Sequence, residues 1–185
     1  MEALLTSTLS VAIAEIGDKT QLLALLLICR FKKPWPIIAG ILAATLLNHA
    51  GAAWVGELIS RWIDPKTLTY LVAGAFIAMA LWILVPDKMD DEESPLDRFG
   101  PFLATFILFF IAEIGDKTQI ATVLLAAKYD AFFQVIAGTT IGMMLANVPV
   151  VLIGKLGADR LPLKWIRIGC ALLFALLGIS TLLMA

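Results

Sequence analysis

One eight-residue segment occurs twice in this chain and reads Ala-Glu-Ile-Gly-Asp-Lys-Thr-Gln at residues 14–21 and again at residues 112–119. Each copy places two carboxylates and one ammonium group inside a long apolar stretch. Ionisable groups are costly in an apolar environment, and inside a membrane they usually have a function. The repeated motif therefore restricts the chain to folds in which buried charged groups have a function.

The composition predicts an integral membrane protein. Of the 185 residues, 61% are hydrophobic and the mean hydropathy is +0.93, values that a soluble domain with a polar exterior rarely reaches. The formal net charge of −1 says little, because the charges are segregated along the chain. No basic patch indicates nucleic acid as a partner. Since the motif interrupts the first apolar run, we expect that run to be retained rather than cleaved as a signal peptide.

Six stretches are long and apolar enough to cross a bilayer, which takes about 20 residues. They cover residues 3–29, 35–59, 68–85, 101–127, 132–153 and 163–184. An acidic segment at residues 86–100 divides them into two groups of three. We therefore predict an all-α membrane protein of six transmembrane helices, with one three-helix repeat at residues 1–85, an acidic linker at 86–100 and a second three-helix repeat at 101–185.

The two groups are related by a constant offset of 98 residues, which places Glu15 on Glu113 and Gly40 on Gly138. Because each group contains an odd number of spans, the second must enter the membrane in the opposite direction from the first. This arrangement is an inverted repeat. Transporters built from inverted repeats commonly bind substrates and coupling ions near the bilayer midplane, where the repeats meet.

The distribution of lysine and arginine predicts the orientation, because short cytoplasmic loops carry an excess of them. One face of the predicted bundle collects Arg30, Lys32, Lys33, Lys88, Arg98, Lys155, Arg160 and Lys164. The opposite face has only Arg61, Lys66 and Lys128. We expect the first face to be cytoplasmic, which puts the acidic linker in the cytosol and both termini outside.

The motif is a candidate site for a divalent cation. On a continuous helix its Glu and Asp would share one face, with the Lys beside them, and the glycine between the acids permits close helix approach or local unwinding. Placed face to face, the two copies combine four carboxylates with two ammonium groups, which leaves a formal charge of −2. One divalent ion or two protons would neutralise that charge. Metal and protons would then compete for the same carboxylates.

The predicted metal ligands are carboxylates and side-chain amides, namely Glu15, Asp18, Glu113, Asp116, Gln21, Gln119, Asn48 and Asn147. The motif residues Lys19, Thr20, Lys117 and Thr118 are expected to support them. Such oxygen donors suit Ca²⁺, Mn²⁺ or Mg²⁺, and the reluctance of Mg²⁺ to lose water favours the other two. His49, which corresponds to Asn147 in the repeat, ranks below the carboxylates as a ligand or proton relay. Asn48 and Asn147 are equally compatible with hydrogen bonds between helices.

Three other interpretations remain open at this point. In the first, Glu–Lys ion pairs merely fix helix packing, which leaves Asp18 and Asp116 unexplained. In the second, these aspartates form the dyad of an intramembrane protease, although each has an adjacent lysine that would hold it ionised. In the third, the same fold exports small organic cations or amino acids through a larger pocket with an apolar lining.

The doubled Glu-x-Gly-Asp-Lys-Thr motif resembles the hallmark of a small membrane family of cation/proton exchangers, which includes Golgi and thylakoid manganese/calcium transporters and bacterial manganese exporters. The resemblance covers essentially the whole chain. It implies a transporter rather than an enzyme, with no cofactor, that exports Mn²⁺ or Ca²⁺ from the cytosol in exchange for protons. It also implies that the four motif carboxylates bind the ion and the protons. Bacterial manganese exporters are the nearest match, which implies a multi-pass protein of the cell inner membrane, and a homodimer is compatible with this class.

Overall fold

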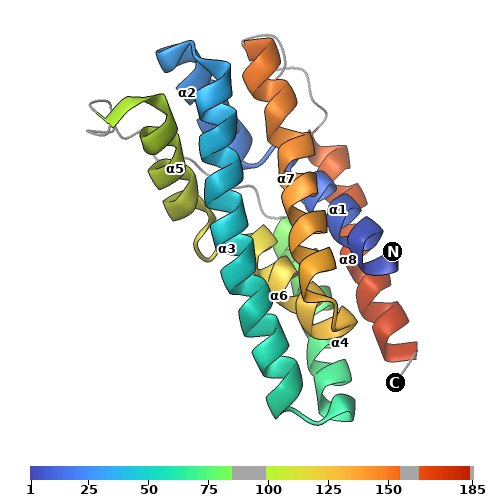
Figure 1. Ribbon diagram of the computed structural model, residues 1–185. Helices are drawn as coiled ribbons and strands as arrows, with labels where there is room; N and C mark the ends of the chain where they lie inside the picture. The colour runs from blue at the N-terminus through green and yellow to red at the C-terminus, as the bar shows by residue number, and fades with distance from the viewer. Residues whose placement is uncertain (85–98, 155–162, 184–185) are drawn as a thin grey trace.

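The computed structural model describes residues 1–84, 99–154 and 163–183, and these residues contain helices and no strand (Figure 1). The helices are α1 (Glu2–Glu15), α2 (Lys19–Phe31), α3 (Pro34–Trp62), α4 (Pro65–Ile83), α5 (Gly100–Glu113), α6 (Lys117–Tyr129), α7 (Phe132–Ile153) and α8 (Leu163–Leu183). The all-α prediction is confirmed for this part of the chain. The acidic linker predicted at residues 86–100 lies outside the described residues, apart from Phe99 and Gly100 where α5 begins.

The first and fourth predicted spans are each interrupted at the repeated motif. α1 ends at Glu15 and α2 begins at Lys19, and in the same way α5 ends at Glu113 and α6 begins at Lys117. The Glu and Asp of each copy therefore do not share a face of one continuous helix, and of the two alternatives that the motif glycine permits, the structure has the local unwinding. The physical reason is the glycine at the centre of the motif, because Gly17 has φ +79°, a conformation that ends a helix and is accessible to glycine at little cost.

The two interruptions have nearly identical local structure. The glycine within each break has positive φ, +79° at Gly17 and +73° at Gly115. In both copies the Asp N–H donates to the Glu carbonyl at 3.1 Å, and the Gly N–H donates to the Gln side-chain carbonyl at 2.7 Å. Identical sequences therefore form the same helix–turn–helix unit twice.

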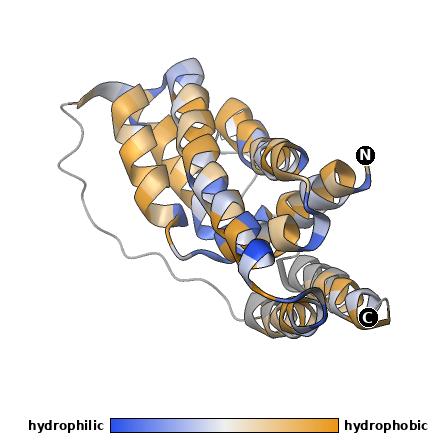
Figure 2. Ribbon diagram, turned by 60° about the horizontal axis from the view of Figure 1, so that its bottom comes forward, coloured by the Kyte–Doolittle hydropathy of each residue, from blue (hydrophilic) through white to orange (hydrophobic). Residues whose placement is uncertain are grey.

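The helices form an elongated bundle in which α7 packs against α1 and α3 packs against α5 and α6 (Figure 1). α4 and α8 pack against each other beside this core. By length and composition, two of the described helices, α3 and α7, are long and apolar enough to cross a membrane. Large apolar side chains are exposed on the outer helices, such as Leu71 at 54% and Leu172 at 60%. Hydrophobic residues predominate along much of the ribbon (Figure 2). This surface suits lipid better than water.

The ends of the helices gather at the two ends of the bundle (Figure 1). α2 ends, α3 and α5 begin and α7 ends toward one end, whereas the α3–α4 and α6–α7 turns lie toward the other. The α1–α2 pair and the α5–α6 pair therefore run in opposite directions. Both breaks fall in the middle of the bundle.

Two glycines separated by 98 residues allow the same close helix contact. A Cβ at Gly138 in α7 would lie 2.6 Å from the Leu4 carbonyl oxygen, and a Cβ at Gly40 in α3 would lie 2.8 Å from the Phe102 carbonyl oxygen. Leu4 and Phe102 are themselves 98 residues apart. The packing of α1 on α7 is thus repeated by the packing of α5 on α3.

Replacement of Gly138 by alanine tests this contact. We expect Gly138→Ala to destabilise the protein by about 1–3 kcal/mol through overpacking against the backbone of α1. Gly51→Ala in α3 is the matched control, because a Cβ there meets nothing within 4 Å and alanine is the better helix former. Thermal unfolding in detergent measures both variants, and equal melting temperatures for the two would contradict the contact.

Candidate metal site

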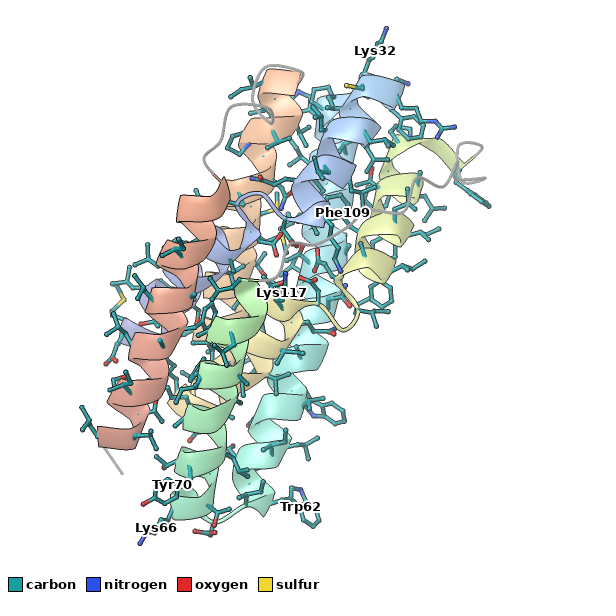
Figure 3. The ribbon with its side chains drawn as sticks, turned by 180° about the vertical axis from the view of Figure 1, so that it is seen from behind. Lys32, Trp62, Lys66, Tyr70, Phe109 and Lys117 are labelled. Carbon is teal, nitrogen blue, oxygen red and sulfur yellow. The ribbon has the colours of Figure 1, made fainter. Side chains whose placement is uncertain are left out.

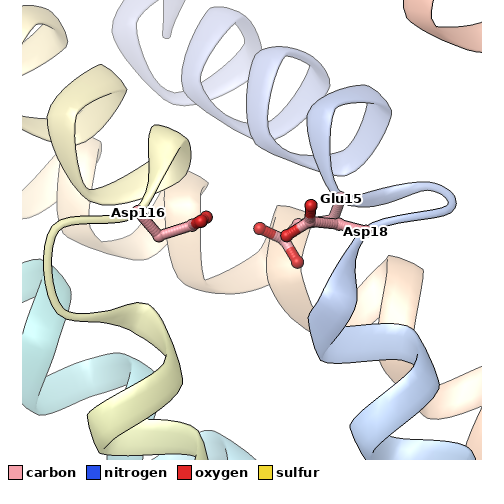
Figure 4. A group of neighbouring side chains, drawn as sticks. All are labelled: Glu15, Asp18 and Asp116. Carbon is pink, nitrogen blue, oxygen red and sulfur yellow. The ribbon is translucent and has the colours of Figure 1, made fainter. Parts of the chain in front are cut away.

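Three carboxylates from the two copies of the motif converge in the middle of the bundle. Glu15 is the last residue of α1, and Asp18 and Asp116 precede the first residues of α2 and α6. One oxygen atom from each lies within 4.8 Å of the other two. Figure 4 shows Asp116 facing Glu15 and Asp18 from the opposite break. We call these three residues the carboxylate cluster.

The carboxylate cluster is buried, with exposures of 0% for Glu15, 6% for Asp18 and 4% for Asp116. Burying ionised carboxylates is expensive unless positive charge or hydrogen bonds compensate them. The breaks in the two helices supply part of this compensation. The positive ends of the α2 and α6 dipoles lie at the two aspartates, and both the N–H and the hydroxyl of Thr118 donate to Asp116 Oδ2, at 3.5 and 3.3 Å.

A lysine joins the two copies of the motif. The Lys19 Nζ lies 2.8 Å from Asp116 Oδ1, so the ammonium group of the first copy pairs with the aspartate of the second. Lys117 is also buried, at 6% exposure, and lies in the middle of the bundle, whereas Lys32 and Lys66 mark its ends (Figure 3). Two motif ammonium groups do not neutralise the four motif carboxylates. The carboxylate cluster therefore retains an attraction for a cation.

Glu15 has one satisfied oxygen and one that is available. Its Oε2 accepts a hydrogen bond from the Thr20 hydroxyl. Its Oε1 is buried and has no hydrogen-bond partner among the residues that the structure describes. A buried carboxylate oxygen without a partner carries an unfavourable desolvation cost. A metal ion or a proton bound at this oxygen would remove that cost.

The fourth motif carboxylate, Glu113, lies beside the carboxylate cluster rather than in it. The Thr45 hydroxyl of α3 donates to Glu113 Oε1 at 3.1 Å, and His49 Nε2 lies 3.8 Å from Glu113 Oε2. Glu113 is fully buried and interacts electrostatically with Glu15 and Asp116. The two copies of the motif thus share a backbone structure but differ in their side-chain partners.

The predicted amide ligands make contacts typical of structural residues. Gln21 accepts from the Gly17 N–H and donates to the Ala146 carbonyl at 2.9 Å. Asn48 donates to the Phe110 carbonyl at 3.1 Å. The other two amides also bond to backbone, Gln119 accepting from Gly115 and Asn147 donating to the carbonyl of Met143. Their role as metal ligands stays a prediction.

The sequence interpretation did not include Thr45, although it is fully buried and donates to Glu113. One signal could have identified it. Thr45 precedes His49 by four residues, so the two side chains lie on the same face of α3. A buried hydroxyl and an imidazole on one face of a helix indicate a polar partner on a neighbouring helix.

Comparison with known proteins adds independent findings. A family model described as "Divalent cation/proton antiporter GDT1" matches residues 3–91 and 101–185. A Vibrio cholerae protein named "Putative manganese exporter" is 58% identical over 182 residues, which cover 98% of this chain and 90% of that protein. GDT1-like proteins of Synechocystis sp. and Arabidopsis thaliana are 27% and 28% identical, over 97% of this chain and 96% and 70% of their own lengths. No solved structure matches the chain.

Neutralising the carboxylate cluster should weaken metal binding. We expect Glu15→Gln, Asp18→Asn and Asp116→Asn each to lower Mn²⁺ affinity at least about tenfold, since even indirect supports of metal ligands have effects of this size. Glu57→Gln is the matched control, because Glu57 pairs with Arg61 near the end of α3. Titration of the purified protein, followed by the EPR signal of free Mn²⁺, measures these affinities. Unchanged affinity in all three variants would exclude the carboxylate cluster as the binding site.

Proposed function

Since this chain belongs to the GDT1 family of divalent cation/proton antiporters, we propose that its cargo is Mn²⁺, which it exports from the cytosol in exchange for protons. The family consists of transporters and not of enzymes. The name of the Vibrio cholerae relative, 58% identical to this chain, supports manganese as the cargo and export as the direction. Within the molecule, the proposal is carried by the convergence of three buried carboxylates on two helix breaks.

The carboxylate cluster suits the exchange of a divalent ion for protons. Carboxylate oxygens bind hard divalent cations, and they also bind protons once they are buried without sufficient positive charge nearby. A site that must be neutralised can be occupied by the metal or by protons, but not fully by both. Competition for Glu15, Asp18 and Asp116 then couples the movement of one substrate to the opposite movement of the other.

The helix breaks contribute to the site with their backbone as well as their side chains. α1 and α5 end at the site with the negative ends of their dipoles, which favour a cation. Discontinuous helices of this kind place unwound carbonyl groups at the ion sites of many transporters. We propose that the ion is bound by the carboxylate cluster, with Glu113 as a further ligand and proton acceptor, and that the motif lysines and threonines position these groups.

A buried site requires a conformational change for the ion to enter and leave. We propose that residues 1–85 and 101–185 are inverted three-span repeats that move against each other, joined by the acidic segment at 86–100. Two observations support this proposal. The α1–α2 and α5–α6 pairs run in opposite directions (Figure 1), and the glycine contact at Gly40 recurs at Gly138. A contact repeated in both halves is suited to alternate between an outward-open and an inward-open arrangement.

We further propose a multi-pass inner-membrane topology in which the α2–α3 connection faces the cytosol. Its basic residues Arg30, Lys32 and Lys33 support this orientation through the positive-inside rule. Lys66, beside the α3–α4 turn, would then face the outside.

Transport by purified protein in liposomes tests the proposed exchange. We expect an imposed pH gradient to drive Mn²⁺ uptake, and acidification on the Mn²⁺ side to lower the apparent affinity because protons occupy the same carboxylates. Asp116→Asn should abolish the uptake, whereas Glu57→Gln should leave it intact. Mn²⁺ flux at the same rate without a pH gradient, and without release of protons, would indicate a channel instead.

Labelling of single cysteines tests the orientation. In a protein with Cys29 and Cys170 replaced by serine, Lys33→Cys and Lys66→Cys place one thiol toward each end of the bundle. We expect a membrane-impermeant maleimide added to intact cells to label Lys66→Cys but not Lys33→Cys. The opposite pattern would reverse the proposed orientation without affecting the exchange reaction.

A further inference from the structure

His49 is the one histidine of the chain, and its environment is unusual. It lies in the middle of α3 and is fully buried. Neither Nδ1 nor Nε2 has a hydrogen-bond partner within residues 1–84, 99–154 and 163–183. Burial of a polar group without a partner costs free energy. Such a group is therefore expected to have a partner at some stage of its function.

A carboxylate oxygen close to His49 Nε2, Glu113 Oε2, also lacks a hydrogen-bond partner among the described residues. The two atoms are 3.8 Å apart. This separation exceeds the usual hydrogen-bond length of about 2.7–3.2 Å. A separation of 3.8 Å does fit two atoms that bind the same divalent ion, because each metal–ligand bond is about 2.0–2.6 Å long. The Thr45 hydroxyl on the same face of α3 is a neighbouring oxygen donor.

We propose that His49 is a nitrogen ligand of the transported ion, bound together with Glu113, and that it makes the site selective for Mn²⁺ over Ca²⁺ and Mg²⁺. This inference rests on the proposed function, because it concerns the same ion and the same carboxylates. Ca²⁺ and Mg²⁺ are bound almost entirely through oxygen, whereas imidazole is a good ligand for divalent first-row transition metals. One nitrogen in an otherwise oxygen-rich site therefore shifts its preference toward the transition metals.

The comparison between the two halves supports a specific role for this position. The residue 98 positions after His49 is Asn147, whose amide donates to Met143 in its own helix, to the carbonyl at 3.1 Å and to the sulfur at 3.0 Å. The Asn147 Oδ1, like the two ring nitrogens of His49, is buried without a hydrogen-bond partner among the described residues. The first half therefore supplies a nitrogen donor where the second half supplies an oxygen donor. His49→Asn introduces the residue that the equivalent helix already contains, which makes it a conservative test.

Pulsed EPR of Mn²⁺ bound to the purified full-length protein, prepared without a histidine tag, tests the ligand directly. We expect modulation of the Mn²⁺ echo by an imidazole nitrogen in the natural protein. Because the chain has a single histidine, this signal can come only from His49. The modulation should disappear in His49→Asn and persist in the control Glu57→Gln, while the carboxylates still bind Mn²⁺ in both.

Transport competition in liposomes tests the selectivity. We expect the Ca²⁺ concentration that halves Mn²⁺ uptake to fall at least about tenfold in His49→Asn, a change equivalent to about 1.4 kcal/mol in relative affinity. His49→Gln provides a second variant if the first does not fold, and the spectrum of the natural protein depends on neither.

Three results would overturn the inference, and they are distinguishable. Bound and transported Mn²⁺ without nitrogen modulation would show an all-oxygen site, with a water or a proton between His49 and Glu113, and would leave the antiport proposal intact. Loss of the modulation with unchanged Ca²⁺ competition would remove the role in selectivity. Absence of Mn²⁺ uptake by the natural protein would refute the proposed function itself and this inference with it.

Discussion

The burial of acidic side chains at two breaks in the helical backbone is the constraint on which the rest of the structure depends. In each motif the backbone turns at a glycine with positive φ between the end of one helix and the start of the next. The Glu at the end of the first helix and the Asp before the second are thereby directed into the bundle. The helix dipoles stabilise the anionic aspartates from one side and favour a cation from the other. This backbone arrangement explains how a strongly apolar chain keeps four carboxylates in its interior.

The two copies of the motif have the same backbone conformation but different side-chain partners. Glu15 accepts from Thr20 of its own motif, whereas the equivalent Glu113 accepts from Thr45 of α3 and faces His49. Lys19 of the first motif pairs with Asp116 of the second. Identical motifs in different environments fit the alternating access that we propose, in which the two halves would exchange roles when the site opens to the other side.

The chemistry of the site separates charge compensation from selectivity. The carboxylate cluster creates the demand for positive charge, and either protons or any small divalent cation can satisfy it. Oxygen donors alone discriminate weakly among these ions, and His49 is a buried imidazole 3.8 Å from Glu113, beside the carboxylate cluster. In the proposed mechanism, exchange and selectivity therefore depend on different residues in the middle of the bundle.

The sequence by itself determined that the protein is helical and that it is a cation/proton exchanger, because both follow from local information: long apolar stretches and two intact copies of a charged motif. It did not determine that the motif breaks its helix, because a glycine is compatible both with a continuous helix and with the positive φ that Gly17 and Gly115 adopt. Nor did it separate Glu113 from the other three carboxylates or join it to Thr45 and His49. Those contacts depend on the crossing of α3 with α5, which close approach at Gly40 permits, and a crossing between distant segments is decided only by tertiary packing.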